Sequence, residues 1–131
     1  MSQSNRDRIL QIARWLAAEF PGPYPITVKC VNKIAALPGS DYMERQTGDF
    51  GETYRYGRLV TIRISCRPNF NRATLIDTLL HEWAHAASMR HANLEEKRLR
   101  VGGHDDEWAL LYGRIYRRFI DEGGAKESRS Y

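Results

Sequence analysis

The chain has 131 residues, of which 42% are hydrophobic and 27% are charged, a balance typical of one soluble globular domain. Its 20 lysine and arginine residues against 16 aspartate and glutamate residues give a net charge of +4, which permits contact with nucleic acid without requiring it. No apolar segment is long enough to span a bilayer, and residues 1–7 lack the basic-then-apolar plan of a signal peptide, so we expect a cytoplasmic protein with no membrane partner.

The first half of the chain predicts one helix followed by strands. Ser4 is suited to cap a helix that runs to about Phe20, because the apolar residues that follow it recur with helical spacing. Pro21 to Pro25 ends this helix and leads into segments in which apolar and polar residues alternate. The predicted strands are residues 26–31, 53–56 and 59–66, with a turn at Gly57-Arg58. Because short turns rather than helices join these runs, we expect a small, antiparallel-rich sheet.

The second half predicts two further helices, at about residues 72–90 and 104–120. Either Asn69 or Asn71 is suited to cap the first of them. The segment between the two helices, residues 94–100, is strongly charged and fits either a short helix or a loop. The sheet is expected to pack against the N-terminal helix and both of these helices.

These elements predict one α+β domain, residues 1–131, in which residues 122–131 form a loose polar tail. The domain has two cysteines, which are too few for a disulfide scaffold. Both Cys30 and Cys66 fall on the apolar face of a predicted strand. We therefore expect buried free thiols rather than a zinc ligand or a cross-strand disulfide.

One stretch inside the helix predicted at residues 72–90 carries a recognisable chemistry. His81, Glu82 and His85 form the pattern H-E-x-x-H, which puts both histidines on one helical face, where their ring nitrogens can bind one zinc ion. Glu82 is then placed to act as general base for a zinc-held water, as in metalloproteases. The alternative is a pair of hydrogen-bonded core histidines. The glutamate between them argues against that alternative, because burying an unpaired carboxylate is costly.

A catalytic zinc usually binds three protein side chains, and the sequence offers three candidates for the third. His91 completes the spacing of the metzincin pattern, but Ser88 stands where that pattern has glycine, and no methionine follows Met89. His104 stands at the start of the last predicted helix, after a glycine pair that lets the chain fold back over the motif helix. Glu107 is an acidic alternative. Of the three, we expect His104.

The segment Gly103-His104-Asp105-Asp106-Glu107-Trp108 resembles the G-H-G-x-x-F element of SprT-like metallopeptidases, the family that includes Spartan. The resemblance extends to the strand ending at Ile64-Ser65 and to the stretch Leu79 to Ala86, and it covers about residues 55–120. It implies a small zincin-like domain with a sheet edge that holds an extended peptide, an active-site helix, and a following helix that carries the third ligand. The chain departs from the family at Asp105, which replaces a glycine, and in lacking the frequent zinc ribbon, so a DNA-targeting role that depends on such appendages does not carry over.

Together these residues predict a zinc-dependent metallopeptidase. His81, His85 and His104 hold the Zn2+ ion, and Glu82 is the general base for a zinc-activated water that attacks the peptide bond of a protein or peptide substrate. One alternative is a zinc-containing binding module, which contacts nucleic acid or a protein partner without proteolysis. Another is a zinc hydrolase that acts on a different amide or ester. The sequence indicates neither the cleavage preference nor the oligomeric state.

Two supporting roles are also predicted. Asp77 lies four residues before His81 on the same helical face and is suited to accept a ring N–H from a zinc-binding histidine. The strand at residues 59–65 is suited, by analogy with the SprT-like family, to align an extended substrate by pairing with it.

Overall fold

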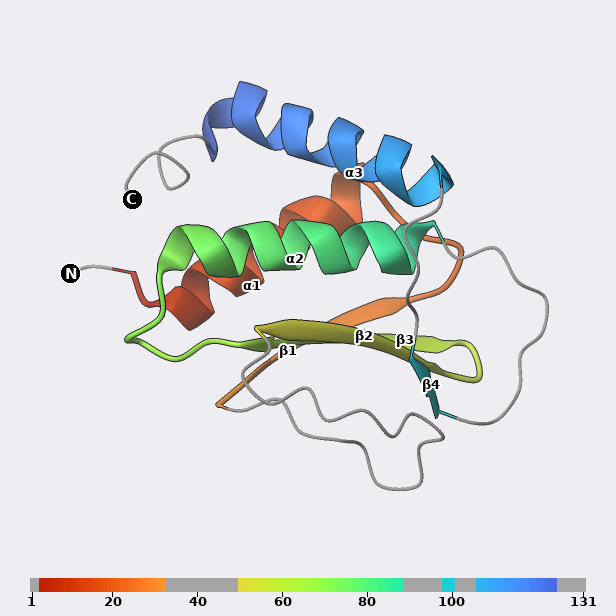
Figure 1. Cartoon of the computed structure of the whole chain (residues 1–131), viewed down its shortest axis with the longest axis horizontal. Coiled ribbons are helices and arrows are strands. Elements are labelled where there is room, and N and C mark those ends of the chain that lie inside the picture. The colour runs from red at the N-terminus through yellow and green to blue at the C-terminus, as the bar shows by residue number, and fades with distance from the viewer. Residues whose placement is uncertain (1–2, 33–49, 89–97, 101–105, 125–131) are drawn as a thin grey trace.

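The structure is a computed structural model that describes residues 3–32, 50–88, 98–100 and 106–124. It has the expected α+β architecture, with the helices stacked on one face of a small sheet (Figure 1). The helices α1 (Asn5–Glu19) and α2 (Arg72–Ala87) contact the sheet directly, and α3 (Asp106–Phe119) lies on the outer side of α2. The apolar core fills the space between these layers.

α1 forms where the sequence predicts it. The Ser4 side chain accepts a hydrogen bond from the Asp7 backbone N–H at 3.0 Å, which caps the first turn. The apolar residues at helical spacing, Ile9, Ile12 and Leu16, are buried. The helix packs against β1 (Ile26–Val31) and α2, so its role is to cover one side of the sheet.

Besides β1, the described strands are β2 (Gly51–Tyr56), β3 (Leu59–Ser65) and β4 (Arg98–Arg100), and the order across the sheet is β1-β3-β2-β4. β2 is antiparallel to β3, as expected, and it is also antiparallel to β4. The Gly57-Arg58 turn joins β2 to β3, and Gly57 has a φ of 59°, a conformation that favours glycine. β1, however, pairs with β3 in parallel, so the expectation of an antiparallel arrangement is wrong for this strand. The reason is that β1 and β3 are not consecutive: β2 lies between them in the chain, so no tight turn joins them and forces them to be antiparallel.

β3 is a central strand, flanked by β1 and β2. Its backbone groups are already hydrogen-bonded on both sides, whereas a peptide adds to a sheet at an edge strand. The expectation that residues 59–65 align a substrate by pairing is therefore wrong. A second correction concerns residues 94–100, expected to be a short helix or a loop. Residues 98–100 form β4, which pairs with the end of β2.

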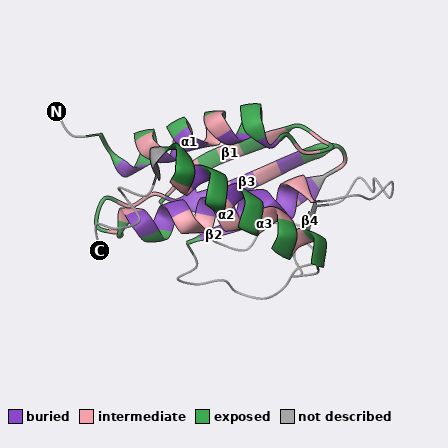
Figure 2. Cartoon of the chain, turned by 90° about the horizontal axis from the view of Figure 1, so that it is seen from above, coloured by how far each residue is buried: buried purple, intermediate pink, exposed green. Residues whose placement is uncertain are grey.

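α2 is the most deeply buried helix (Figure 2). Asn71, rather than Asn69, caps it: the Asn71 side chain accepts the Thr74 backbone N–H at 3.1 Å. Buried residues lie on most sides of this helix, because it contacts β2 and β3 of the sheet as well as the helices α1 and α3. The described helix ends at Ala87, and residues 89–90 of the predicted helix lie outside the described part of the chain.

α3 lies within the predicted range of residues 104–120 and is followed by a short π-helical segment, Ile120–Gly124. Ile115 is fully buried toward the core. Arg118 forms an ion pair with Glu19 of α1, which ties the C-terminal end of α3 to the first helix. None of the helices in the described segments is both long enough and apolar enough to cross a bilayer.

The two cysteines meet at one end of the sheet. Cys30 and Cys66 are free thiols as expected, though each is partly rather than fully buried, and their sulfur atoms are 2.8 Å apart. The Cys66 S–H donates to the Cys30 sulfur. This hydrogen bond lowers the pKa of Cys30 and raises the pKa of Cys66, while burial raises the pKa of Cys66 further. Cys30 is therefore the thiol more easily converted to a thiolate.

Candidate metal and catalytic site

α2 brings the two motif histidines together. His81 and His85 lie one helical turn apart, and their Nε2 atoms are 3.2 Å from each other. Two nitrogen ligands of a tetrahedral zinc, each about 2.0–2.1 Å from the metal, lie about 3.3–3.4 Å apart. The separation of the two Nε2 atoms is therefore close to that of two zinc ligands. Without a metal, the same separation suits an N–H···N hydrogen bond from one ring to the other.

Glu82 is buried beside the histidines, with 8% of its surface exposed. The Thr53 hydroxyl oxygen lies 2.7 Å from Glu82 Oε1 and 3.1 Å from the Glu82 backbone oxygen, so its one proton serves a single acceptor at a time. The second carboxylate oxygen, Oε2, lies 4.0 Å from His81 Nε2. Thr53 therefore helps to orient the carboxylate with one oxygen toward the histidine pair.

Replacing Thr53 with valine tests this contact. Valine keeps the shape of the side chain but removes the hydroxyl, so the buried Glu82 carboxylate loses a hydrogen-bond donor. We expect the free energy of unfolding to fall by about 1–3 kcal/mol, measured by urea denaturation of the metal-free chain. Thr53→Ser keeps the hydroxyl and is the matched control, expected to destabilise less. If Thr53→Val unfolds with the same free energy as the wild type, the hydroxyl contributes nothing.

Two aromatic side chains of α3 hold the imidazole rings in place. The Trp108 indole N–H donates to the His81 backbone oxygen at 3.3 Å, and the Trp108 ring stacks on the His85 ring with 5.1 Å between centroids. The Tyr112 ring stacks on Trp108 at 5.2 Å and meets the His81 ring edge-on at 5.8 Å. α3 therefore restricts the rotation of both histidines and covers one side of the site.

A cavity of about 410 Å³ opens beside Glu82, a volume typical of small-ligand sites. We call it the catalytic cavity, after the catalytic role that the sequence predicts for Glu82; its walls include Gly51, Asp77, His81, Glu82 and Tyr112. Glycine is needed in this wall, because a Cβ on Gly51 would lie 2.7 Å from a side-chain atom of α2. The close approach of β2 to α2 at this point leads directly to the contact between Thr53 and Glu82.

The third ligand stays a prediction from the sequence. His91 and His104 both lie outside the residues that the structure describes. Glu107 is exposed in the first turn of α3. Among the described residues, no group of three or more His, Cys, Asp or Glu side chains that could hold a metal forms.

Asp77 lines the catalytic cavity, but its carboxylate is not placed as the sequence predicts. Its Oδ1 atom is buried and has no hydrogen-bond partner within the described part of the chain. That oxygen therefore does not accept a ring N–H from His81. Burial raises the pKa of the Asp77 carboxyl, because removal from water disfavours the charged form.

Sequence reasoning missed Thr53 and the positioning contacts of Trp108. The only sign of Thr53 in the sequence is its place in a predicted strand. In the structure Thr53 pairs with Ile62, and both side chains lie on the face of the sheet that carries the core. Its contact with Glu82 depends on how β2 lies under α2, which no local pattern reveals. Trp108 was visible as the aromatic residue of the family-like element, but its stacking on His85 depends on how α3 docks.

Comparison with family models, with curated proteins and with solved structures finds no match to this chain. The resemblance to SprT-like metallopeptidases therefore rests on the motif residues themselves.

Proposed function

We propose that this protein is a zinc-dependent metallopeptidase. The observation that carries the proposal is the convergence of His81 Nε2 and His85 Nε2, 3.2 Å apart, with the buried Glu82 carboxylate beside them. These histidines would hold the metal together with His104, the third ligand expected from the sequence. When bound, zinc supplies a Lewis acid that lowers the pKa of water and polarises a carbonyl group.

The chain's own residues account for the proton transfers. Glu82 accepts a proton from a water molecule in the catalytic cavity and later delivers it to the leaving amine nitrogen, so one carboxylate serves as base and then as acid. Thr53 keeps Oε1 of Glu82 in place, which leaves Oε2 on the side of the histidines. Trp108 and Tyr112 limit the motion of the imidazole rings, so the site is ordered before a substrate binds.

Metal removal tests this function. We expect zinc-loaded protein to hydrolyse labelled casein and internally quenched peptides, to fall to background after treatment with 1,10-phenanthroline, and to recover when zinc is restored. A parallel screen with small amide and ester substrates is the control for substrate class. Hydrolysis of those compounds without any peptide cleavage would favour a non-peptidase hydrolase. A chain that holds zinc but turns over none of these substrates would favour a binding module.

A further inference from the structure

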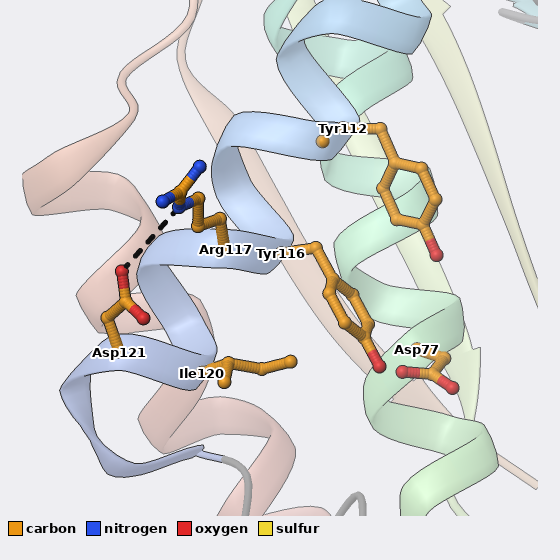
Figure 3. Close-up of a pocket in the computed structure, with 7 residues that line it drawn as sticks. Asp77, Tyr112, Tyr116, Arg117, Ile120 and Asp121 are labelled. Carbon is orange, nitrogen blue, oxygen red and sulfur yellow. Dashed lines mark ion pairs between the residues drawn. The ribbon is translucent and has the colours of Figure 1, made fainter.

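A second cavity adjoins the catalytic cavity between α2 and the C-terminal half of α3. Its volume is about 600 Å³, and we call it the side pocket. It is lined chiefly by Asp77, Tyr112, Gly113, Tyr116 and Ile120 (Figure 3). Asp77 and Tyr112 also line the catalytic cavity. A substrate bound beside Glu82 can therefore extend a side chain into the side pocket.

The carboxylate of Asp77 distinguishes this pocket from an ordinary apolar cleft. Its Oδ1 atom is buried with no hydrogen-bond partner in the described segments, an arrangement that is costly unless a donor or a cation is supplied. Figure 3 shows Asp77 on α2, facing the tyrosines of α3. The other charged residues of the pocket, Arg117 and Asp121, form an ion pair with each other at 4.0 Å and are largely exposed at the rim. The described chain therefore offers Asp77 no cation of its own.

The remaining walls suit a long side chain with an apolar stem. The rings of Tyr112 and Tyr116 lie 6.2 Å apart at 68° to each other, and Ile120 adds an aliphatic surface. Lysine and arginine bury their methylene groups along such surfaces, and their charged groups interact favourably with aromatic rings. Gly113 also lines the pocket, and a Cβ at this position would meet no atom within 4 Å, so this part of the wall has room for a larger side chain.

We propose that the side pocket binds a lysine or arginine side chain of the peptide substrate, close to the bond that is cleaved, with Asp77 as the partner of its charged group. This inference rests on the proposed peptidase function and adds a substrate preference to it. Leucine would fill the apolar walls but leave Asp77 without a donor, and glutamate would be repelled by it.

Quenched peptides that differ at one position test the preference. Arginine, lysine, leucine or glutamate is placed at each position around the cleaved bond, and kcat/KM is measured for the zinc-loaded full chain. We expect the best arginine or lysine peptide to be cleaved roughly 10- to 100-fold more efficiently than its leucine counterpart. Asp77→Asn should reduce that ratio to near one, while Asp77→Glu, which keeps the charge, should retain most of it. A ratio near one in the wild type, or a ratio that Asp77→Asn leaves intact, overturns the proposal.

Gly113→Leu provides a second variant that leaves Asp77 in place. Gly113 lines the side pocket, and an added Cβ would meet no atom within 4 Å, so a leucine at this position has room to reach into the pocket. Leucine is also a better helix former than glycine, so the variant is expected to fold. We expect it to lower the ratio at least tenfold, and Gly113→Ala, which adds only a methyl group, to lower it less. If Gly113→Leu keeps the full wild-type ratio, the basic side chain is bound elsewhere and the proposal is wrong.

A binding measurement separates this inference from the peptidase function. N-acetyl-arginine amide and N-acetyl-leucine amide are titrated into the zinc-loaded chain, and the backbone amide shifts of α2 and α3 are followed by NMR. We expect the arginine compound to bind more tightly, and Asp77→Asn to weaken its binding about tenfold or more. If no peptide is cleaved but this binding pattern is observed, the proposed peptidase function is wrong, while the binding of a basic side chain in the side pocket is supported. If arginine amide binds no better than leucine amide, the side pocket fails even in an active peptidase.

Discussion

Glu82→Gln is expected to retain one zinc per chain and to lose about 10²–10⁴-fold in kcat. Glutamine keeps the length and shape of glutamate, and its amide oxygen can still accept the hydrogen bond from Thr53. What it loses is a carboxylate oxygen able to take up a proton beside the histidine pair. Zinc content by mass spectrometry and initial rates on quenched peptides, measured on the same preparation, check both halves of the prediction.

Glu19→Gln is the matched control for this substitution. Glu19 lies at the end of α1 and pairs with Arg118, away from the cavity that Glu82 lines. The control should therefore show wild-type rates. If Glu82→Gln also keeps wild-type rates, Glu82 is not the general base. If it loses both zinc and activity, its carboxylate holds the metal site together, and its role as a base has to be tested by another substitution.

His81→Ala and His85→Ala are each expected to lower the zinc content from about one per chain to nearly none. Their Nε2 atoms lie 3.2 Å apart, and each variant removes one of the two ligands that we propose the helix supplies. Zinc should raise the thermal midpoint of the wild type, since a ligand that binds only the folded state stabilises it, and it should leave the midpoints of both variants unchanged. Metal analysis and thermal unfolding with and without added zinc make the test.

The same measurement on His104→Ala and His91→Ala identifies the third ligand. We expect His104→Ala to lose most of the zinc and His91→Ala to keep it. The reverse result would favour a metzincin-like ligand set and would contradict the SprT-like interpretation. Retention of zinc in both would leave an acidic ligand such as Glu107 as the remaining candidate from the sequence.

The local structure of this protein follows closely from its sequence. Ser4 and Asn71 cap the helices that their positions predict, because capping depends on a side chain and a backbone N–H a few residues away. The strands predicted from alternation at residues 26–31 and 59–66 form at residues 26–31 and 59–65. His81 and His85 share a helical face because residues four apart always do. Because this spacing and the glutamate between the histidines form the H-E-x-x-H pattern, the sequence by itself identifies Glu82 and the two histidines as a candidate site.

Only the tertiary structure decided how these pieces meet. β1 and β3 are not consecutive in the chain, yet they pair in parallel, and this pairing makes β3 a central strand. Three contacts at the site each join residues more than 20 positions apart. They are the hydrogen bond of Thr53 to Glu82, the stacking of Trp108 on His85, and the wall that Asp77 and Tyr112 form between the two cavities. Such contacts depend on how β2 lies under α2 and on how α3 docks on α2. Neighbouring residues in the sequence do not determine these arrangements, because the packing of the whole core selects them.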